Sequence, residues 1–200
     1  MLKGVDVSHY QGTIDWLKVK AAGMGFAFVK VTDGESWVDP CCHLNTVGAR
    51  AAGLTVGAYH FFRPLDDAKT QAQHFIDTVD LLGGPFLVAL DVEDCGDDWD
   101  QFTHQQIAEM VNTWLDTVQA AFRTAPFFYT NQPFADKYLT MVATGVYPLW
   151  LARYAQKVPA GWQNYKVWQE SESGAVDGIP GKVDLDYAND GVDLSQYLSK

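Results

Sequence analysis

The stretch FLVALDVED, residues 86–94, passes from an unbroken apolar run directly into carboxylates. A run of this length, bounded by glycines, predicts a strand buried on both faces, as in a parallel sheet. Alternate side chains of a strand share a face, so Asp91 and Glu93 point the same way, about 6.5–7 Å apart. Two such carboxylates suit acid/base chemistry, because burial and crowding raise the pKa of one of them. The alternative is a strand that simply ends in a solvated acidic loop.

Strands alternate with helix-length segments on both sides of this stretch. Strands are predicted at 2–8, 26–32, 55–62, 86–93 and 126–132, and helices at 13–23, 41–52, 66–82 and 103–122. Three further strands, at 149–154, 165–171 and 182–188, are separated by gaps too short or too rich in Pro and Gly for full helices. Repeated β-α units favour a parallel sheet, and eight strands favour a closed barrel. The sequence therefore predicts an α/β fold: an irregular TIM-like β/α barrel with five β-α units followed by three strands lacking full helices.

Composition narrows the function classes. The 200-residue chain has a formal net charge of −11, which argues against nucleic acid and anionic membranes and favours a neutral polymer or small molecule. Aromatic content of 14% fits a sugar cleft, where rings stack on pyranose faces, although ordinary core packing explains most aromatic residues. No apolar run reaches the length of a membrane span, and the N-terminus lacks a signal-peptide pattern. Three cysteines form neither a disulfide framework nor a zinc spacing.

Polar side chains gather where the predicted strands end, which is where β/α barrels carry their active sites. The acids among them are Asp6, Asp91, Glu93, Asp184 and Asp186, and the other candidates are Tyr59, Phe61, Tyr129, Trp150, Arg153 and Gln169. The first and eighth strands are neighbours in a closed barrel, so we expect Asp6 and Asp184 to lie close together. The chain has no G-x-S-x-G, H-E-x-x-H, P-loop or G-x-G-x-x-G motif. Acids and aromatic rings without a metal or cofactor motif indicate glycoside hydrolysis.

Several motifs carry a resemblance to a known family. They are GVDVSHYQG (4–12), GAYHF (57–61), ALDVE (89–93), YTN (129–131), LWLARY (149–154), VWQ (167–169) and GKVDLD (181–186). In this order, and spread from residue 4 to about residue 188, they resemble the lysozymes of glycoside hydrolase family 25, the fungal, bacterial and bacteriophage muramidases. One departure stands in the second strand, where KVTDG replaces the more usual K-x-T-E-G. We expect the shorter Asp33 to alter a polar contact near the site without abolishing activity.

The resemblance implies cleavage of the β-1,4 bond between N-acetylmuramic acid and N-acetylglucosamine in peptidoglycan. It assigns Glu93 as the general acid that later activates water, and Asp91 as the group that orients the 2-acetamido group or stabilises developing positive charge. Asp6 and Asp184 would fix this geometry and tune the pKa of Glu93. Net retention through the acetamido group is the leading mechanism, and direct carboxylate attack is the alternative.

Substrate contacts are expected from the remaining candidates, with plain barrel packing as the alternative for each aromatic residue. They are Tyr59, Phe61, Tyr129, Trp150, Arg153, Gln169 and Asp186. Neither a metal nor a cofactor is expected. Two other functions stay open: a glycosidase acting on chitin or another N-acetylated glucan, and a non-catalytic carbohydrate-binding barrel. The presence of all four acids disfavours the second.

The predicted organisation is one catalytic barrel domain over residues 1–200, with no separate cell-wall-binding domain. The expected partner is the peptidoglycan glycan strand, with no nucleic acid and no membrane, and the protein is expected to be a monomer. Without a signal peptide, a bacteriophage endolysin is the favoured origin. Such a protein is made in the host cytoplasm and reaches the cell wall at lysis; otherwise it would be secreted by a route that this sequence does not encode.

Overall fold

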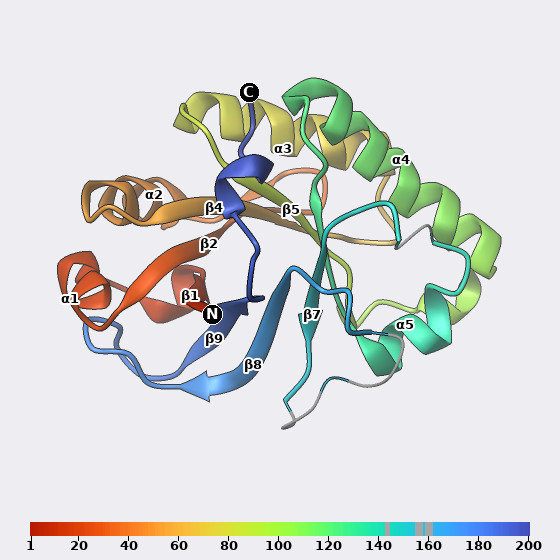
Figure 1. Ribbon diagram of the computed structural model, residues 1–200. Helices are drawn as coiled ribbons and strands as arrows, with labels where there is room; N and C mark the ends of the chain where they lie inside the picture. The colour runs from red at the N-terminus through yellow and green to blue at the C-terminus, as the bar shows by residue number, and fades with distance from the viewer. Residues whose placement is uncertain (143–144, 155–157, 159–161) are drawn as a thin grey trace.

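Eight strands close into a barrel in the computed structural model, which describes residues 1–142, 145–154, 158 and 162–200 (Figure 1). They are β1 (Leu2–Val7), β2 (Met24–Asp33), β4 (Thr55–Phe61), β5 (Leu87–Asp91), β6 (Phe127–Asn131), β7 (Leu149–Ala152), β8 (Val167–Gly174) and β9 (Val183–Ala188). The pairing of β1 with β2 closes the ring, and the short strand β3 (Trp37–Val38) extends β2 outside it. The irregular β/α barrel predicted from the sequence is confirmed.

Helices follow the first five barrel strands and lie around the outside of the ring (Figure 1). They are α1 (Trp16–Ala21), α2 (Cys42–Ala51), α3 (Ala68–Leu82), α4 (His104–Phe122) and α5 (Gln132–Tyr138), with three 3-10 turns, η1 (His9–Gln11), η2 (Trp99–Gln101) and η3 (Leu194–Tyr197). Side-chain caps fix where the long helices begin: Asp67 accepts from Thr70 N before α3, and Thr103 forms a capping box with Gln106 before α4. Within the described residues, no helix combines the length and apolar character that crossing a bilayer requires.

The last strand runs against its neighbours. β9 is antiparallel to both β8 and β1, whereas the other neighbouring barrel strands pair in parallel. The connection 175–182 is too short for the crossover that a parallel strand needs, so the chain turns back as a hairpin. The start of β9 therefore reaches the same end of the barrel as the C-terminal ends of the parallel strands. Asp184 pairs there with Asp6 in the strand register, as the neighbour argument predicted.

Side chains fill the barrel interior, so the ring is a packed core. Phe28 stacks on Trp150 with ring centroids 4.2 Å apart, and Tyr129 meets the same indole edge-on at 4.7 Å. Gly57 makes room for this aromatic stack, because a Cβ there would lie 2.2 Å from the Phe28 ring. A second apolar cluster lies between the barrel and the helices, and α4 contributes Ile107, Val111, Trp114, Leu115 and Val118 to it. Open space is consequently found at the ends of the barrel.

A buried polar network ties the end of β4 to the loop that follows it. Thr32 Oγ1 lies 2.8 Å from His60 Nδ1, and His60 Nε2 lies 3.0 Å from Gln71 Oε1. The amide of Gln71 is oriented by its donation to the Arg63 carbonyl, so His60 donates from Nε2 and accepts at Nδ1. Burial lowers the pKa of His60 to about 3, which keeps the ring neutral. The network holds Arg63 next to the barrel mouth.

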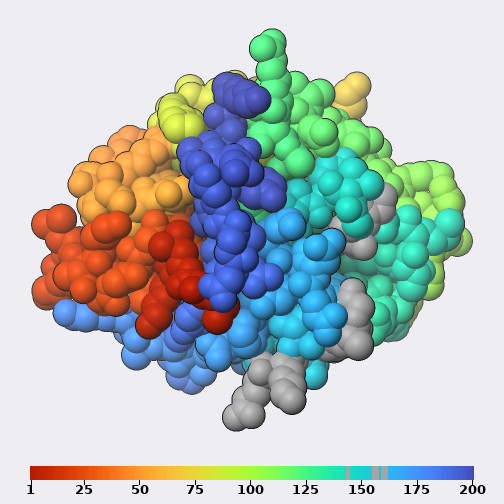
Figure 2. Space-filling view, in the orientation of Figure 1, coloured from red at the N-terminus to blue at the C-terminus, as the bar shows by residue number. Residues whose placement is uncertain are grey.

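The chain after β9 crosses the opposite end of the barrel. Figure 2 shows these residues, in dark blue, running over the middle of that face. Leu194 is buried against the inner core, the Tyr197 ring packs on Phe127 at 5.2 Å, and Leu198 bridges to Leu87. Ser199 N donates to the Phe86 carbonyl at 2.8 Å. This segment covers the inner core at the end of the barrel that lies away from the acids.

Candidate active site

The four acids assigned a catalytic role from the sequence line one pocket of about 200 Å³ at the mouth of the barrel. Asp6 comes from β1, Asp91 is the last residue of β5, and Asp184 lies near the start of β9. Glu93 follows two residues after β5, so the predicted strand 86–93 is too long at its C-terminal end. The same pocket is lined by five of the predicted substrate contacts, Tyr59, Phe61, Tyr129, Trp150 and Gln169.

Asp91 presents an acceptor that the protein leaves unused. Its side chain is buried, and within the described part of the chain Oδ1 has no hydrogen-bond partner. The backbone around it is fixed, because Phe62 N donates to the Asp91 carbonyl and Val92 N donates to the Tyr129 carbonyl, both at 3.0 Å. A buried polar atom of this kind needs an explanation, and at a pocket wall a ligand donor supplies one.

Burial governs the protonation of the acid pair. It raises the pKa of Glu93 to about 7, with the charge of Asp184 adding to the effect. Burial also raises the pKa of Asp91 well above its usual value, and the nearby Glu93 charge raises it further. The ammonium of Lys30 opposes both shifts. A carboxyl group that titrates near neutrality can serve both as proton donor and as proton acceptor.

Asp6, Asp184 and Asp186 form a second cluster of acids on the neighbouring strands β1 and β9. Asp6 pairs with Asp184 in the register of β1 and β9, and Asp186 pairs with Gly4. Burial and the two neighbouring aspartates raise the pKa of Asp6 well above its usual value. Burial likewise raises the pKa of Asp186 to about 7, although its Oδ1 accepts from Trp150 Nε1 at 2.8 Å. Like charges this close favour retention of protons within the cluster.

Gln169 connects this cluster to two tyrosines. Its Nε2 donates to Asp6 Oδ2 at 2.7 Å, and its Oε1 accepts from Tyr129 at 3.0 Å and from Tyr154 at 2.8 Å. Both lone pairs of the amide oxygen are occupied, so the amide cannot flip without losing these bonds. The buried amide fixes one oxygen of Asp6 and thereby orients the carboxyl group in the pocket.

Asp33 holds two cations at the edge of the pocket. Its carboxylate accepts from Lys30 Nζ at 2.8 Å and from Arg63 Nε at 2.7 Å. These ion pairs lower the pKa of Asp33 against the opposing effect of burial. Lys30 also lies over the Phe61 ring, 4.3 Å from its centroid. The shorter Asp33 thus contacts both Lys30 and Arg63, and its effect on activity stays a prediction.

Two predicted substrate contacts do not line this pocket. Asp186 is fully buried one pleat deeper than Asp184, bonded to the indole of Trp150. Arg153 contributes backbone bonds instead: its N donates to the Gln169 carbonyl, and its carbonyl accepts from Trp168 Nε1. Sequence reasoning missed Tyr10 and Gln11 among the lining residues. Ser8 and Lys30, and Tyr154 beside Gln169, stand at predicted strand ends, although no role was assigned to them. For Lys30 a signal existed, since a charge interrupts the apolar run FAFVKVT.

The comparison with protein families matches this chain to Glycosyl hydrolases family 25 over residues 5–179. The chain belongs to this family. Membership makes it a glycoside hydrolase and accounts for a barrel whose mouth carries acids on β1, β5 and β9.

Similar proteins include an uncharacterized relative and two bacterial lysozymes. The uncharacterized protein YegX of Escherichia coli strain K12 is 36% identical over 98% of this family 25 chain and 72% of its own length. Lysozyme M1 of Streptomyces globisporus is 31% identical over 94% of this chain and 68% of its own. The crystal structure of the bacterial lysozyme from Streptomyces coelicolor superposes with a TM-score of 0.85 at 30% identity, covering 98% of this chain and 95% of that one.

Proposed function

We propose that this protein is a muramidase of the lysozyme type, which cleaves the β-1,4 bond between N-acetylmuramic acid and N-acetylglucosamine in peptidoglycan. The observation that carries the proposal is the pairing of a near-neutral acid, Glu93, with the unpartnered buried Oδ1 of Asp91 in one pocket. The names of lysozyme relatives in the same family support the choice of substrate.

The first step of the proposed reaction needs a proton on Glu93. Its carboxyl group donates that proton to the glycosidic oxygen as the bond to the anomeric carbon breaks. Asp91 Oδ1 accepts the N–H of the 2-acetamido group and thereby directs the acetamido oxygen to the anomeric carbon. In its ionised form Asp91 also stabilises the positive charge that develops there. The carboxylate of Glu93 then takes a proton from the water that opens the cyclic intermediate, so the configuration is retained.

Cleavage of purified peptidoglycan by wild type and by Glu93→Gln tests the activity. Wild type should release fragments with muramic acid at the new reducing end, and the variant should be at least about 100-fold slower. Glu109→Gln on the exposed surface of α4 removes the same charge far from the pocket and should behave as wild type. Fragments with glucosamine at the new reducing end, or cleavage of chitin alone, would refute the muramidase assignment.

The role of the acetamido group needs a separate test. A substrate with a trifluoroacetamido group has a less nucleophilic carbonyl oxygen, so its cleavage should slow sharply if that oxygen attacks the anomeric carbon. Proton NMR of the first product should show the β-anomer. An unchanged rate with the fluorinated substrate, together with retention, would favour direct attack by Asp91 instead.

The oligomeric state and the place of action are part of the same proposal. The acidic net charge of −11 favours a protein that does not bind nucleic acid, and we expect a monomer, which light scattering can check. Action on the host wall as a bacteriophage endolysin stays a prediction from the sequence.

A further inference from the structure

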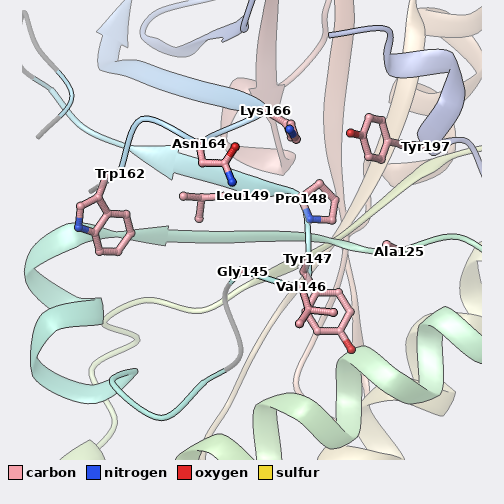
Figure 3. A pocket seen from close by; sticks show the side chains of 10 residues that line it. All are labelled: Ala125, Gly145, Val146, Tyr147, Pro148, Leu149, Trp162, Asn164, Lys166 and Tyr197. Carbon is pink, nitrogen blue, oxygen red and sulfur yellow. The ribbon is translucent and has the colours of Figure 1, made fainter. Parts of the chain in front are cut away.

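A second pocket opens at the end of the barrel away from the acids (Figure 3). Its walls come from the segments that enter β6, β7 and β8, represented by Ala125, Leu149 and Lys166, and from Tyr197 on η3. The volume is about 380 Å³, and the pocket shares no lining residue with the acidic one. Small-molecule sites commonly occupy about 300–1,000 Å³, so the space accommodates a ligand.

Main-chain hydrogen bonds hold this pocket open. Phe128 N donates to the Pro148 carbonyl at 2.9 Å, and Lys166 N donates to the Leu149 carbonyl at 2.8 Å. Tyr147 points out of the pocket, and its hydroxyl donates to Asp116 on α4 at 2.5 Å (Figure 3). These bonds fix the walls at the starts of β6, β7 and β8, whereas Trp162 and Asn164 lie in the segment that precedes β8.

The side chains that face this space have the chemistry of a sugar site. Figure 3 shows Asn164 and Lys166 between the rings of Trp162 and Tyr197. Among the described residues, no hydrogen bond or ion pair engages the side chains of Trp162, Asn164 and Lys166. Flat rings beside an amide and an amine suit a pyranose with an acetamido or carboxylate substituent.

The positive charge of Lys166 indicates which class of sugar this pocket would bind. Lys166 is the charged residue among those lining the pocket, on a chain whose net charge is −11. An anionic group is repelled by most of this surface and attracted to this spot. Peptidoglycan carries carboxylates on its peptide stems, and on lactyl groups that bear no peptide, next to N-acetylated rings, whereas chitin carries none.

We propose that this far pocket binds a second segment of peptidoglycan, an N-acetylated sugar whose carboxylate lies beside Lys166, while the acidic pocket holds the segment to be cut. The inference rests on the proposed muramidase function. A short strand in the acidic pocket cannot reach the opposite end of the barrel, so the second segment belongs to another part of the wall. Two weak contacts with one polymer mesh lengthen the residence of the enzyme on the wall.

Sedimentation with insoluble peptidoglycan, acid-stripped of attached phosphate polymers, tests this contact. The Glu93→Gln background prevents cleavage during the measurement. Adding Lys166→Ser or Trp162→Ala should weaken binding about threefold to tenfold. Lys69→Ser, an exposed charge change at the start of α3, is the matched control and should leave binding unchanged. Lys166→Ser keeps the inference testable if Trp162→Ala fails to fold.

The outcomes separate this inference from the proposed function. Unchanged binding of both folded variants would overturn the second site. Weakened binding that appears only with walls retaining their phosphate polymers would also overturn it, because the ligand would then be a phosphate chain. Cleavage of a soluble muropeptide tetrasaccharide by wild type tests the muramidase function alone. That fragment can occupy the acidic pocket without reaching the far pocket.

Discussion

The substitution Glu93→Gln should make the folded protein more stable, and the gain should grow with pH. The folded-state pKa of Glu93 is raised from 4.5 to about 7. The stabilisation that comes with the neutral carboxyl group is fully present below about pH 4.5 and is lost as the pH rises through about 7. The difference of about 2.5 units corresponds to about 3.4 kcal/mol for full ionisation in the folded state. Partial solvent access reduces this to about 2 kcal/mol.

Thermal unfolding of both proteins at pH 5 and pH 8 measures this effect. Glutamine keeps the volume of the side chain and has no charge to bury, so it escapes the penalty at high pH. We expect a gain of about 2 kcal/mol at pH 8 and about 0.5 kcal/mol at pH 5. For a domain of this size the gain at pH 8 corresponds to about 4–8 °C in Tm.

Glu109→Gln provides the control for net charge, because it removes a carboxylate from the exposed face of α4. It should give no gain that depends on pH. A gain for Glu93→Gln that is equal at both pH values, or absent at pH 8, would refute the claim that burial raises the pKa of Glu93. Such a result would also remove the physical basis for its role as proton donor near neutrality.

Three further results are expected. Cleavage by wild type should fall about tenfold per pH unit above about pH 7, because Glu93 must carry its proton; a steady-state rate profile that stays flat to alkaline pH would contradict this. Gln169→Leu should lower kcat at least about tenfold with little change in KM and should shift the pH profile, since Asp6 loses its donor. An unchanged pH profile of the rate would contradict a positioning role for Gln169. His60, with a pKa of about 3, should stay neutral by NMR at pH 4.5, and stability tied to this neutral ring should decrease as the pH falls below 6.5. A ring titrating near pH 6.5 would show that the network is open to water.

The sequence was sufficient to locate the mouth of the barrel but not the depth of each side chain. An apolar run that ends in carboxylates places Asp91 at a strand end, and the closure of a barrel places Asp6 beside Asp184. The alternation of side chains along a strand also puts Asp184 and Asp186 on one face. Asp184 lines the pocket, however, whereas Asp186 lies one pleat deeper in the barrel. An alternating pattern shows which face of a strand a side chain lies on. It does not show how far along the barrel axis that side chain lies.

The sequence revealed neither the direction of the last strand nor the hydrogen-bond partners of Gln169. The pattern KVDLDYA is the same for a parallel and an antiparallel strand, and the short connection before it is what sets the hairpin. The partners of Gln169 come from residues up to 163 positions apart in sequence. An amide that serves three polar groups is visible only after the strands are assembled, which is why a substrate contact was predicted for it.

The antiparallel closure has a consequence for biosynthesis. β1 is among the first segments to leave the ribosome, but one of its two edges is covered only when residues 183–188 have been made. Until then the nascent chain exposes an unpaired strand edge, and Asp6 has no partner in Asp184. Contacts between such distant segments form late and slow the folding reaction. The active site is thus complete only after β9 has been translated. Ribosome-bound intermediates should therefore be inactive on peptidoglycan. Their unpaired β1 edge should also make them prone to aggregation.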